Sequence, residues 1–272
     1  MNTTLPTYFL SHGGGPWPWM TGSFKNGHAE LAKSLQHIQH TLPTRPKAVL
    51  MITAHWEEEQ FTLSSAAAPG MLYDYGGFPE HTYRVQYPAL GHPELASEIQ
   101  HVLSSQGIAA QLEPHRGYDH GTFVVLSQMY PKADVPLVQM SLRNTLNPQE
   151  HIALGQALAP LRQQGVLILG SGMSFHNMRL FNAAGEKASR AFDDWLQDTM
   201  THCTPEERVN RLLHWHKAPA AQLAHPREEH LMPLMVILGC AIHEVGTCIY
   251  RETDFLNHLT LSSFRLGQTN LS

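Results

Sequence analysis

The 272-residue sequence has few of the features that mark membrane, secreted or redox-active proteins. No apolar run approaches the roughly 18 residues of a membrane helix, and the opening MNTTLPTYFL lacks the basic and then apolar pattern of a signal peptide. The only cysteines are Cys203, Cys240 and Cys248, and they form no CxxC pair. This usage favours structural thiols in a reducing compartment. We therefore expect a cytoplasmic protein with no membrane partner.

Charge and the common nucleotide or nucleophile motifs are also sparse. Charged residues make up 15% of the chain, and the net charge of −5 is spread without a long run of either sign. Because phosphate binding needs clustered Lys and Arg, no nucleic-acid partner is expected. Gly13-Gly14-Gly15 lacks GxGxxG spacing and is followed by Pro16, which argues against a nucleotide site. No GxSxG motif of a serine hydrolase occurs.

Histidine, by contrast, is abundant, with 19 His against 18 Lys plus Arg. Three short apolar runs have the pattern of strands buried on both faces, at residues 7–10, 47–54 and 166–169. A histidine follows each of these strands, namely His12, His55 and His176. The carboxyl ends of parallel strands meet at one edge of an α/β sheet, where ligands bind. We expect the loops that carry these histidines to converge at that edge.

The alternation of strand and helix patterns along the chain predicts an α/β fold. We expect a single domain, residues 1–272, with a mostly parallel or mixed central sheet and helices on both faces. Further strands are predicted at 108–112, 135–142, 245–250 and 259–264. Helices are predicted at 21–40, 93–103, 122–129, 148–164 and 225–242, with two more in 184–217. Residues 65–92 are rich in Gly, Pro and aromatics without periodicity, which is typical of a functional loop.

The candidate metal ligands are His12, His55 and His230, which lie on separate elements. Neutral imidazole suits Zn, Fe and Cu, and three protein ligands with open positions are typical of a catalytic site. For each histidine alone, a satisfied core or surface role is the alternative. His176 and His120 are candidates for acid–base chemistry near neutral pH. Asp119, beside His120, either orients its ring or caps the helix that begins there.

The sequence resembles the class III extradiol ring-cleaving dioxygenases, and within them the DOPA 4,5-dioxygenase-like branch. The resemblance spans nearly the whole chain and rests on blocks in the same order: SHGGGP at 11–16, TAHW at 53–56, YDYGGFPEHTYRVQYPALG at 73–91, DHGTF at 119–123, SGMSFHN at 171–177 and EEHLMPLMVILG at 228–239. It implies a single α/β domain whose mononuclear non-haem site needs Fe(II) for activity and carries Zn(II) in purified or crystallised forms. The implied substrates are a small aromatic diol and O2.

The resemblance also implies roles for individual histidines. His12, His55 and His230 would be the metal ligands, His176 the acid/base and possible fourth ligand, and His120 a second pocket histidine. Protocatechuate-type members of the family use a glutamate as third ligand, whereas the aligned residue here is His230, with Glu229 beside it. Either Glu229 or His230 therefore remains a candidate third ligand, and the ligand set alone does not choose between iron and zinc.

Two other functions fit the same ligand pattern. A zinc-dependent hydrolase would use a metal-bound water as nucleophile, and a binding homologue without activity could retain the fold. Oxygen-dependent opening of a catechol ring would distinguish the dioxygenase from both alternatives. The sequence does not identify the natural catechol or the residues that bind it. It does not reveal the oligomeric state either.

Overall fold

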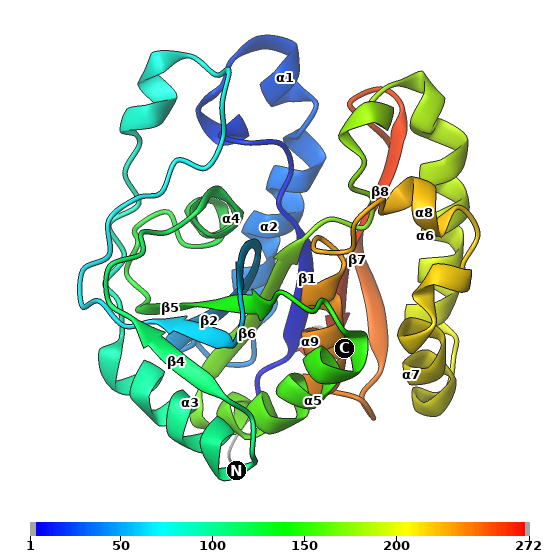
Figure 1. Cartoon of the computed structure of the whole chain (residues 1–272). Helices are drawn as coiled ribbons and strands as arrows, with labels where there is room; N and C mark the ends of the chain where they lie inside the picture. Colours follow the sequence, from blue (N-terminus) through cyan, green and yellow to red (C-terminus); the bar gives the residue numbers. More distant parts are fainter. Residues whose placement is uncertain (1–3, 270–272) are drawn as a thin grey trace.

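The computed structural model describes residues 4–269, in which strands and helices alternate (Figure 1). The strands are β1 (Thr7–Ser11), β2 (Ala48–Glu58), β3 (Phe61–Ser64), β4 (Ala110–Glu113), β5 (Leu137–Arg143), β6 (Val166–Gly172), β7 (Gly246–Phe255) and β8 (Leu259–Leu266). The α-helices are α1 (Gly22–Asn26), α2 (Ala29–Thr41), α3 (Pro93–Ser105), α4 (His120–Met129), α5 (Pro148–Leu158), α6 (Glu186–Thr201), α7 (Pro205–Leu213), α8 (Ala221–Ala224) and α9 (Met232–Cys240).

All of these strands join one 8-stranded sheet in the order β4-β3-β5-β2-β6-β1-β8-β7. The central strands β5, β2, β6 and β1 are parallel to one another. The sheet becomes antiparallel on both sides of this centre, where β3 meets β5 and β8 meets β1. The predicted fold class, an α/β domain with a mixed central sheet, is confirmed. The assignment of residues 1–272 to one catalytic domain stays a prediction.

Consecutive residues of β6 show that helices cover both faces of the sheet. Because successive side chains of a strand point to opposite faces, Gly170 and Ser171 contact different layers. A Cβ on Gly170 would lie 2.8 Å from the Pro233 carbonyl oxygen in α9. Ser171 Oγ instead donates a hydrogen bond to the Gly121 carbonyl oxygen in α4 at 2.6 Å. Helix α9 therefore lies on one face, and α4 lies on the other.

The apolar runs chosen from the sequence form the centre of the core. Leu50, Met51 and Ile52 in β2, like Leu167 and Ile168 in β6, are completely buried. Strands β1, β6 and β2 are adjacent and parallel, so their carboxyl ends share one edge of the sheet, as predicted. This edge faces upward in Figure 1. Within residues 4–269, no helix has the length and apolar character needed to span a membrane.

The helix predicted at 21–40 is interrupted, because it consists of α1 and α2 with a break at Gly27 and His28. His28 is buried, and both of its ring nitrogens bond to backbone groups. Its Nδ1 donates to the Phe24 carbonyl oxygen at 2.7 Å, and its Nε2 accepts from Gly14 N at 3.1 Å. The second bond crosses to the glycine loop after β1, so periodicity along the helix could not reveal it.

Other helices and strands also differ from their predicted boundaries, for similar reasons. The helix predicted at 225–242 is limited to Met232–Cys240, with Pro233 in its first turn, because the preceding backbone bonds to the segment after β6. The helix predicted at 148–164 changes to a 3₁₀-helix (Ala159–Gln164) at Pro160, which lacks the N–H for an α-helical bond, and it ends at Gly165 as expected. Strand β3 was not predicted, and the predicted 65–92 loop contains only a short 3₁₀-helix (Glu80–Arg84).

Candidate metal centre

His12 directly follows β1 and is held by backbone contacts on both sides. Its N–H donates to the Gly172 carbonyl oxygen at 3.0 Å, which continues the pairing of β1 with β6. Its carbonyl oxygen accepts from Trp17 Nε1 at 2.9 Å, and its Nδ1 donates to the Gly13 carbonyl oxygen at 2.7 Å. Gly13 has φ +76°, and a Cβ there would lie 2.7 Å from Trp17 Nε1, so only glycine fits. With Nδ1 engaged, the Nε2 lone pair of His12 is free for another ligand.

His55 lies inside β2 rather than in the loop after it, where it was predicted. The ladder between β2 and β5 is irregular between Ile52 and Glu57 and then resumes, which extends the strand to Glu58. This irregular stretch carries the His55 ring toward the start of α4. A Cβ on Gly121 would lie 3.0 Å from His55 Cδ2, so the missing side chain lets the helix approach the ring closely.

His230 lies two residues before α9 and contacts the end of β6. Its carbonyl oxygen accepts from Met173 N at 3.1 Å. A Cβ on Gly172 would lie only 2.1 Å from that oxygen, so glycine is required for this close approach. The His230 Nδ1 lies 2.8 Å from Glu229 Oε1 and donates to this carboxylate.

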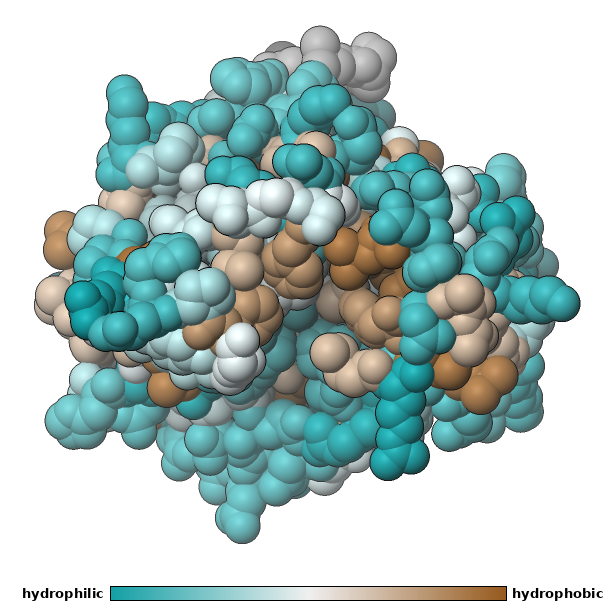
Figure 2. Space-filling view, turned by 90° about the horizontal axis from the view of Figure 1, so that it is seen from above, coloured by the Kyte–Doolittle hydropathy of each residue, from teal (hydrophilic) through white to brown (hydrophobic). Residues whose placement is uncertain are grey.

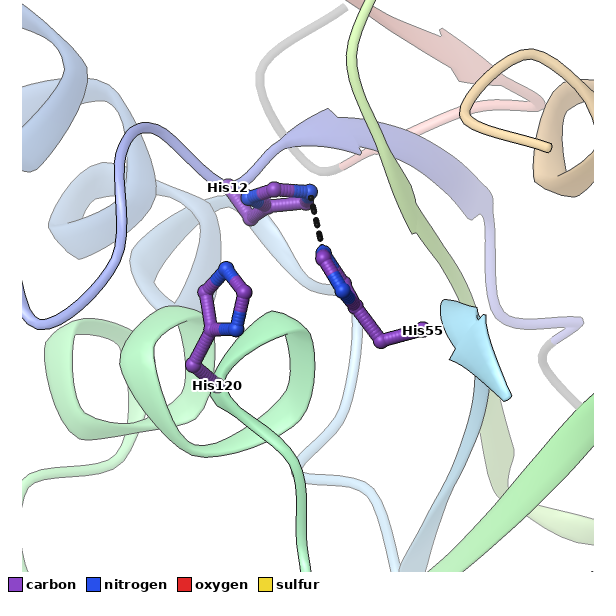
Figure 3. Close-up of side chains that lie close together, drawn as sticks. All are labelled: His12, His55 and His120. Carbon is purple, nitrogen blue, oxygen red and sulfur yellow. Dashed lines mark hydrogen bonds between the residues drawn. The ribbon is translucent and has the colours of Figure 1, made fainter. Parts of the chain in front are cut away.

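The three histidines predicted as ligands approach one another through their Nε2 atoms. His55 Nε2 lies 3.2 Å from His12 Nε2 and 3.3 Å from His230 Nε2; Figure 3 shows the first of these contacts. Burial holds the pKa of all three rings well below the usual value of 6.5, and the neighbouring histidines lower it further. The rings are therefore neutral near pH 7. Neutral imidazoles whose Nδ1 atoms face acceptors and whose Nε2 atoms converge form a donor set suited to a divalent metal.

His120 is the first residue of α4 and points toward His12 and His55 (Figure 3). Its backbone N and its Nδ1 donate to Asp74 Oδ1 at 2.9 and 2.8 Å. Asp119, the residue that the sequence suggested for either orienting this ring or capping the helix, caps the helix by accepting from Thr122 N at 3.1 Å.

His176 lies after β6 at the more open side of the centre. Its ring stacks on that of His230 with centroids 3.3 Å apart, and its Nδ1 lies 3.3 Å from Glu229 Oε1. The His176 side chain is 21% exposed, whereas that of His230 is 4% exposed. A ligand entering from solvent therefore reaches His176 more easily than His230.

The possible ligand atoms fall into two compact groups. His12, His55 and His120 form one, and His176, Glu229 and His230 form the other, each with its atoms within 4.8 Å of one another. The predicted trio spans both groups through the contact between His55 and His230. All five predicted site histidines thus lie in one centre at the carboxyl edge of the sheet.

Two carboxylates lie beside the histidine rings of this centre. Asp74 had no predicted role, and Glu229 was predicted only as an alternative third metal ligand. Asp74 lies in the long loop. Burial would raise its pKa, but its hydrogen bonds and electrostatic interaction with His120 lower it to about 2. Burial also opposes ionisation of Glu229, yet the hydrogen bond from His176 and nearby Arg227 hold its pKa below the usual value. Both groups are ionised near neutral pH. For Asp74, the only signal in the sequence is an acid between two tyrosines in a loop without periodicity.

Aromatic side chains line the approach to His120. Tyr75 contacts the His120 ring at 5.8 Å between centroids, and Phe123, Tyr73 and Phe78 pack around Tyr75. Two tryptophans near the centre pack elsewhere, because Trp17 stacks on His28 and Trp56 lies under the Arg116 guanidinium. Figure 2, which looks down on this edge of the sheet, shows a hollow near the middle with apolar residues along its side.

Comparison with known proteins places these features in a family. The family described as "Catalytic LigB subunit of aromatic ring-opening dioxygenase" matches residues 6–258. A protein of Beta vulgaris named 4,5-DOPA dioxygenase extradiol is 38% identical, with 86% of each chain covered. One of the same name from Escherichia coli is 30% identical, covering 98% of this chain and 96% of that one.

A further relative and one solved structure are also similar to this chain. The dioxygenase tasH of Hapsidospora irregularis is 37% identical over 88% of this chain and 79% of its own. The crystal structure of an uncharacterized protein from Escherichia coli K12 matches with a TM-score of 0.78 and 28% identity, covering 97% of this chain and 100% of the other. The chain thus belongs to the LigB family of aromatic ring-opening dioxygenases, and it is an enzyme of the extradiol class.

Proposed function

We propose that this enzyme uses Fe(II) held by His12, His55 and His230 to open the ring of a catechol with a DOPA-like side chain. The observation that carries the proposal is the meeting of three Nε2 atoms, 3.2 and 3.3 Å apart around His55. Lone pairs of neutral imidazoles repel one another at this distance unless a proton or a cation lies between them. The names of the relatives from Beta vulgaris and Escherichia coli support the choice of substrate.

His230, rather than Glu229, is proposed as the third ligand. The Glu229 carboxylate contacts the outward nitrogens, Nδ1 of His230 at 2.8 Å and Nδ1 of His176 at 3.3 Å. A carboxylate in that place orients a ligating ring and raises its basicity. The all-imidazole set suits both iron and zinc. We therefore expect Fe(II) in the active form and Zn(II) in protein purified without added iron.

When bound, Fe(II) would bring the catechol and O2 together in one coordination sphere and supply the redox chemistry that ring opening requires. His176 is proposed to accept a proton from a catechol hydroxyl at Nε2, because its Nδ1 faces Glu229. The Glu229 carboxylate then stabilises the protonated ring. His176 returns the proton later in the reaction.

His120 is proposed to stabilise negative charge that develops on oxygen. Asp74 accepts a hydrogen bond from Nδ1 of His120 and holds this ring beside those of His12 and His55. In this role Nε2 of His120 would also carry a proton, which it would donate as a hydrogen bond to that oxygen. The face of Tyr75 and its aromatic neighbours offers an apolar wall against which the substrate ring can lie. The residues of the chain thus bind and orient the substrate and move its protons.

The test is reconstitution of the zinc-free protein with Fe(II) without oxygen, followed by addition of DOPA or catechol and then O2. We expect consumption of one O2 per catechol and the absorbance of a ring-opened semialdehyde. Zinc-loaded protein and the His55→Ala variant serve as controls without activity. Hydrolysis of an ester or amide by the zinc form without oxygen, or metal binding with no turnover of any catechol, would contradict the proposal.

A further inference from the structure

We infer that Asp74 is a positioning residue that holds two rings at once, the pocket histidine His120 through Oδ1 and the proposed metal ligand His55 through Oδ2. We call this arrangement the Asp74 clamp. Its Oδ1 accepts from the backbone N and from Nδ1 of His120 at 2.9 and 2.8 Å. Its Oδ2 lies 3.3 Å from Nδ1 of His55. The inference rests on the proposed function, because it treats His55 as a ligand.

The clamp sets which nitrogen of His55 carries the proton. An acceptor beside Nδ1 keeps the proton on that atom and leaves the Nε2 lone pair free toward His12 and His230. If the proton moved to Nε2, this nitrogen could no longer bind a metal. Asp74 therefore acts on the metal through the protonation pattern of His55.

Glu229 occupies a similar place on the other side of the centre but uses its oxygens differently. One oxygen, Oε1, faces both Nδ1 of His230 and Nδ1 of His176. Its Oε2 instead lies 3.4 Å from Nη1 of Arg227, an exposed side chain that also pairs with Glu57. An amide at position 229 can therefore keep a carbonyl oxygen toward both rings.

An amide at position 74 cannot do the same. The backbone N–H of His120 has no alternative protonation state, so an asparagine must place its oxygen there. Its NH2 group then replaces Oδ2 and presents hydrogens to His55 Nδ1. This favours the His55 form with the proton on Nε2, which opposes metal binding. The usually conservative change Asp74→Asn is thus more harmful than Asp74→Ala, which leaves room for a water as acceptor.

The clamp also ties the long loop to the metal centre. Tyr73 and Tyr75, on either side of Asp74, donate their hydroxyls to the carbonyl oxygens of Val85 and Thr82 within the same loop. Tyr75 in addition contacts the His120 ring. The long loop therefore carries both the tyrosines of the aromatic wall and the carboxylate that holds His55. A shift of this loop would move the wall and disturb the proposed ligand together.

The test measures Zn²⁺ affinity of zinc-free protein by competition with a chromogenic chelator near pH 7.5. We expect Asp74→Asn to lose about 10- to 100-fold, the range typical for partners of ligating histidines. Asp74→Ala should lose less than Asp74→Asn. Glu229→Gln should also lose less than Asp74→Asn, because its oxygen still faces both rings. Glu80→Gln, in the same loop and 81% exposed, is the matched control and should bind as the wild type does.

Nitrogen NMR of ¹⁵N-histidine-labelled, zinc-free protein provides a readout that general loosening of the fold would not mimic. We expect His55 to carry its proton on Nδ1 in the wild type and on Nε2 in Asp74→Asn. If Asp74→Asn does not fold, Asp74→Ala carries the test, and wild-type affinity in that variant overturns the inference. Equal or tighter binding by Asp74→Asn than by Asp74→Ala also overturns it. Failure of the wild type to bind zinc would instead contradict the proposed function.

Discussion

Histidines are buried in the metal centre and also in a structural region outside it, which includes His28 and His151, and these two groups use their ring nitrogens in opposite ways. Around the glycine loop, His28 donates from Nδ1 to Phe24 and accepts at Nε2 from Gly14 N. At the start of α5, His151 likewise donates to the Asn147 carbonyl oxygen and accepts from Arg143 N. Each of these rings bridges two backbone groups and needs nothing further.

In the metal centre, the outward nitrogens have similar acceptors, but the inward nitrogens have only each other. His12 Nδ1 donates to a backbone oxygen, and His230 Nδ1 donates to a carboxylate, while both Nε2 atoms approach Nε2 of His55. Burial lowers the pKa in both regions, to about 4 for His28. Burial and neutrality therefore do not distinguish a structural histidine from a ligand, whereas the partner of the second nitrogen does.

The largest expected effect separates the two regions directly. Because His55 supplies the central lone pair, His55→Ala should weaken zinc binding by more than about 100-fold, beyond the loss typical for a residue that only hydrogen-bonds to a ligating ring. His28→Phe should destabilise the fold but leave the folded protein with stoichiometric zinc. Metal analysis of purified protein, with circular dichroism as a check on folding, measures both. Zinc at full occupancy in His55→Ala would remove this residue from the ligand set.

A second prediction separates the acid–base role from the ligand role among the histidines of the metal centre. His176→Ala should lower the turnover of Fe(II)-loaded enzyme by about 10²- to 10⁴-fold, the range for loss of a general acid–base group. The amount of bound metal should change little, because the trio of His12, His55 and His230 is intact. Parallel assays of O2 consumption and iron content separate the two outcomes. An equal loss of iron would make His176 a fourth ligand.

The sequence could predict the positions of the strand-end histidines, but it could not predict the role of Asp74. The continuous apolar runs before His12, His55 and His176 identify central parallel strands, and their shared edge follows from the topology of such sheets. Asp74 could not be found this way, because its position depends on a folded loop without periodicity.

The errors in element boundaries have the same cause. The break at His28 and the short α9 both come from hydrogen bonds to backbone that is distant in sequence. Local patterns predict where the chain is buried, but not which distant N–H or C=O group competes for a given residue. The orientation of each ring, which determines its role, depends on those distant partners.

A third prediction concerns pH and tests the structural region. The pKa of His28 is about 4 in the folded chain because of burial, against 6.5 for an ordinary histidine. Between these values the unfolded chain binds more protons, so stability is full above about pH 6.5 and falls toward pH 4, by about 3 kcal/mol from this group. Urea unfolding of zinc-free protein between pH 4 and 7 should show a shallower dependence for His28→Phe. An unchanged slope would mean that His28 is not held neutral.

The smallest predicted effect concerns the backbone contact that positions His230. An alanine at Gly172 would bring its Cβ to 2.1 Å from the His230 carbonyl oxygen, whereas a Cβ at Gly76 would meet nothing within 4 Å. Gly172→Ala should therefore lower the free energy of unfolding by about 1–3 kcal/mol and weaken zinc binding. Gly76→Ala is the matched control, expected to change stability by less than about 0.5 kcal/mol. Equal effects of the two changes would show that the close approach is not required.

The most direct test of the central claim is an anomalous-difference map from crystals of the zinc- or iron-loaded enzyme, recorded at the metal absorption edge. A single peak bonded to the Nε2 atoms of His12, His55 and His230, with Glu229 and Asp74 on the outward nitrogens, is the predicted result. A peak bonded to the Glu229 carboxylate, or one elsewhere in the molecule with these three rings left unbound, would contradict it.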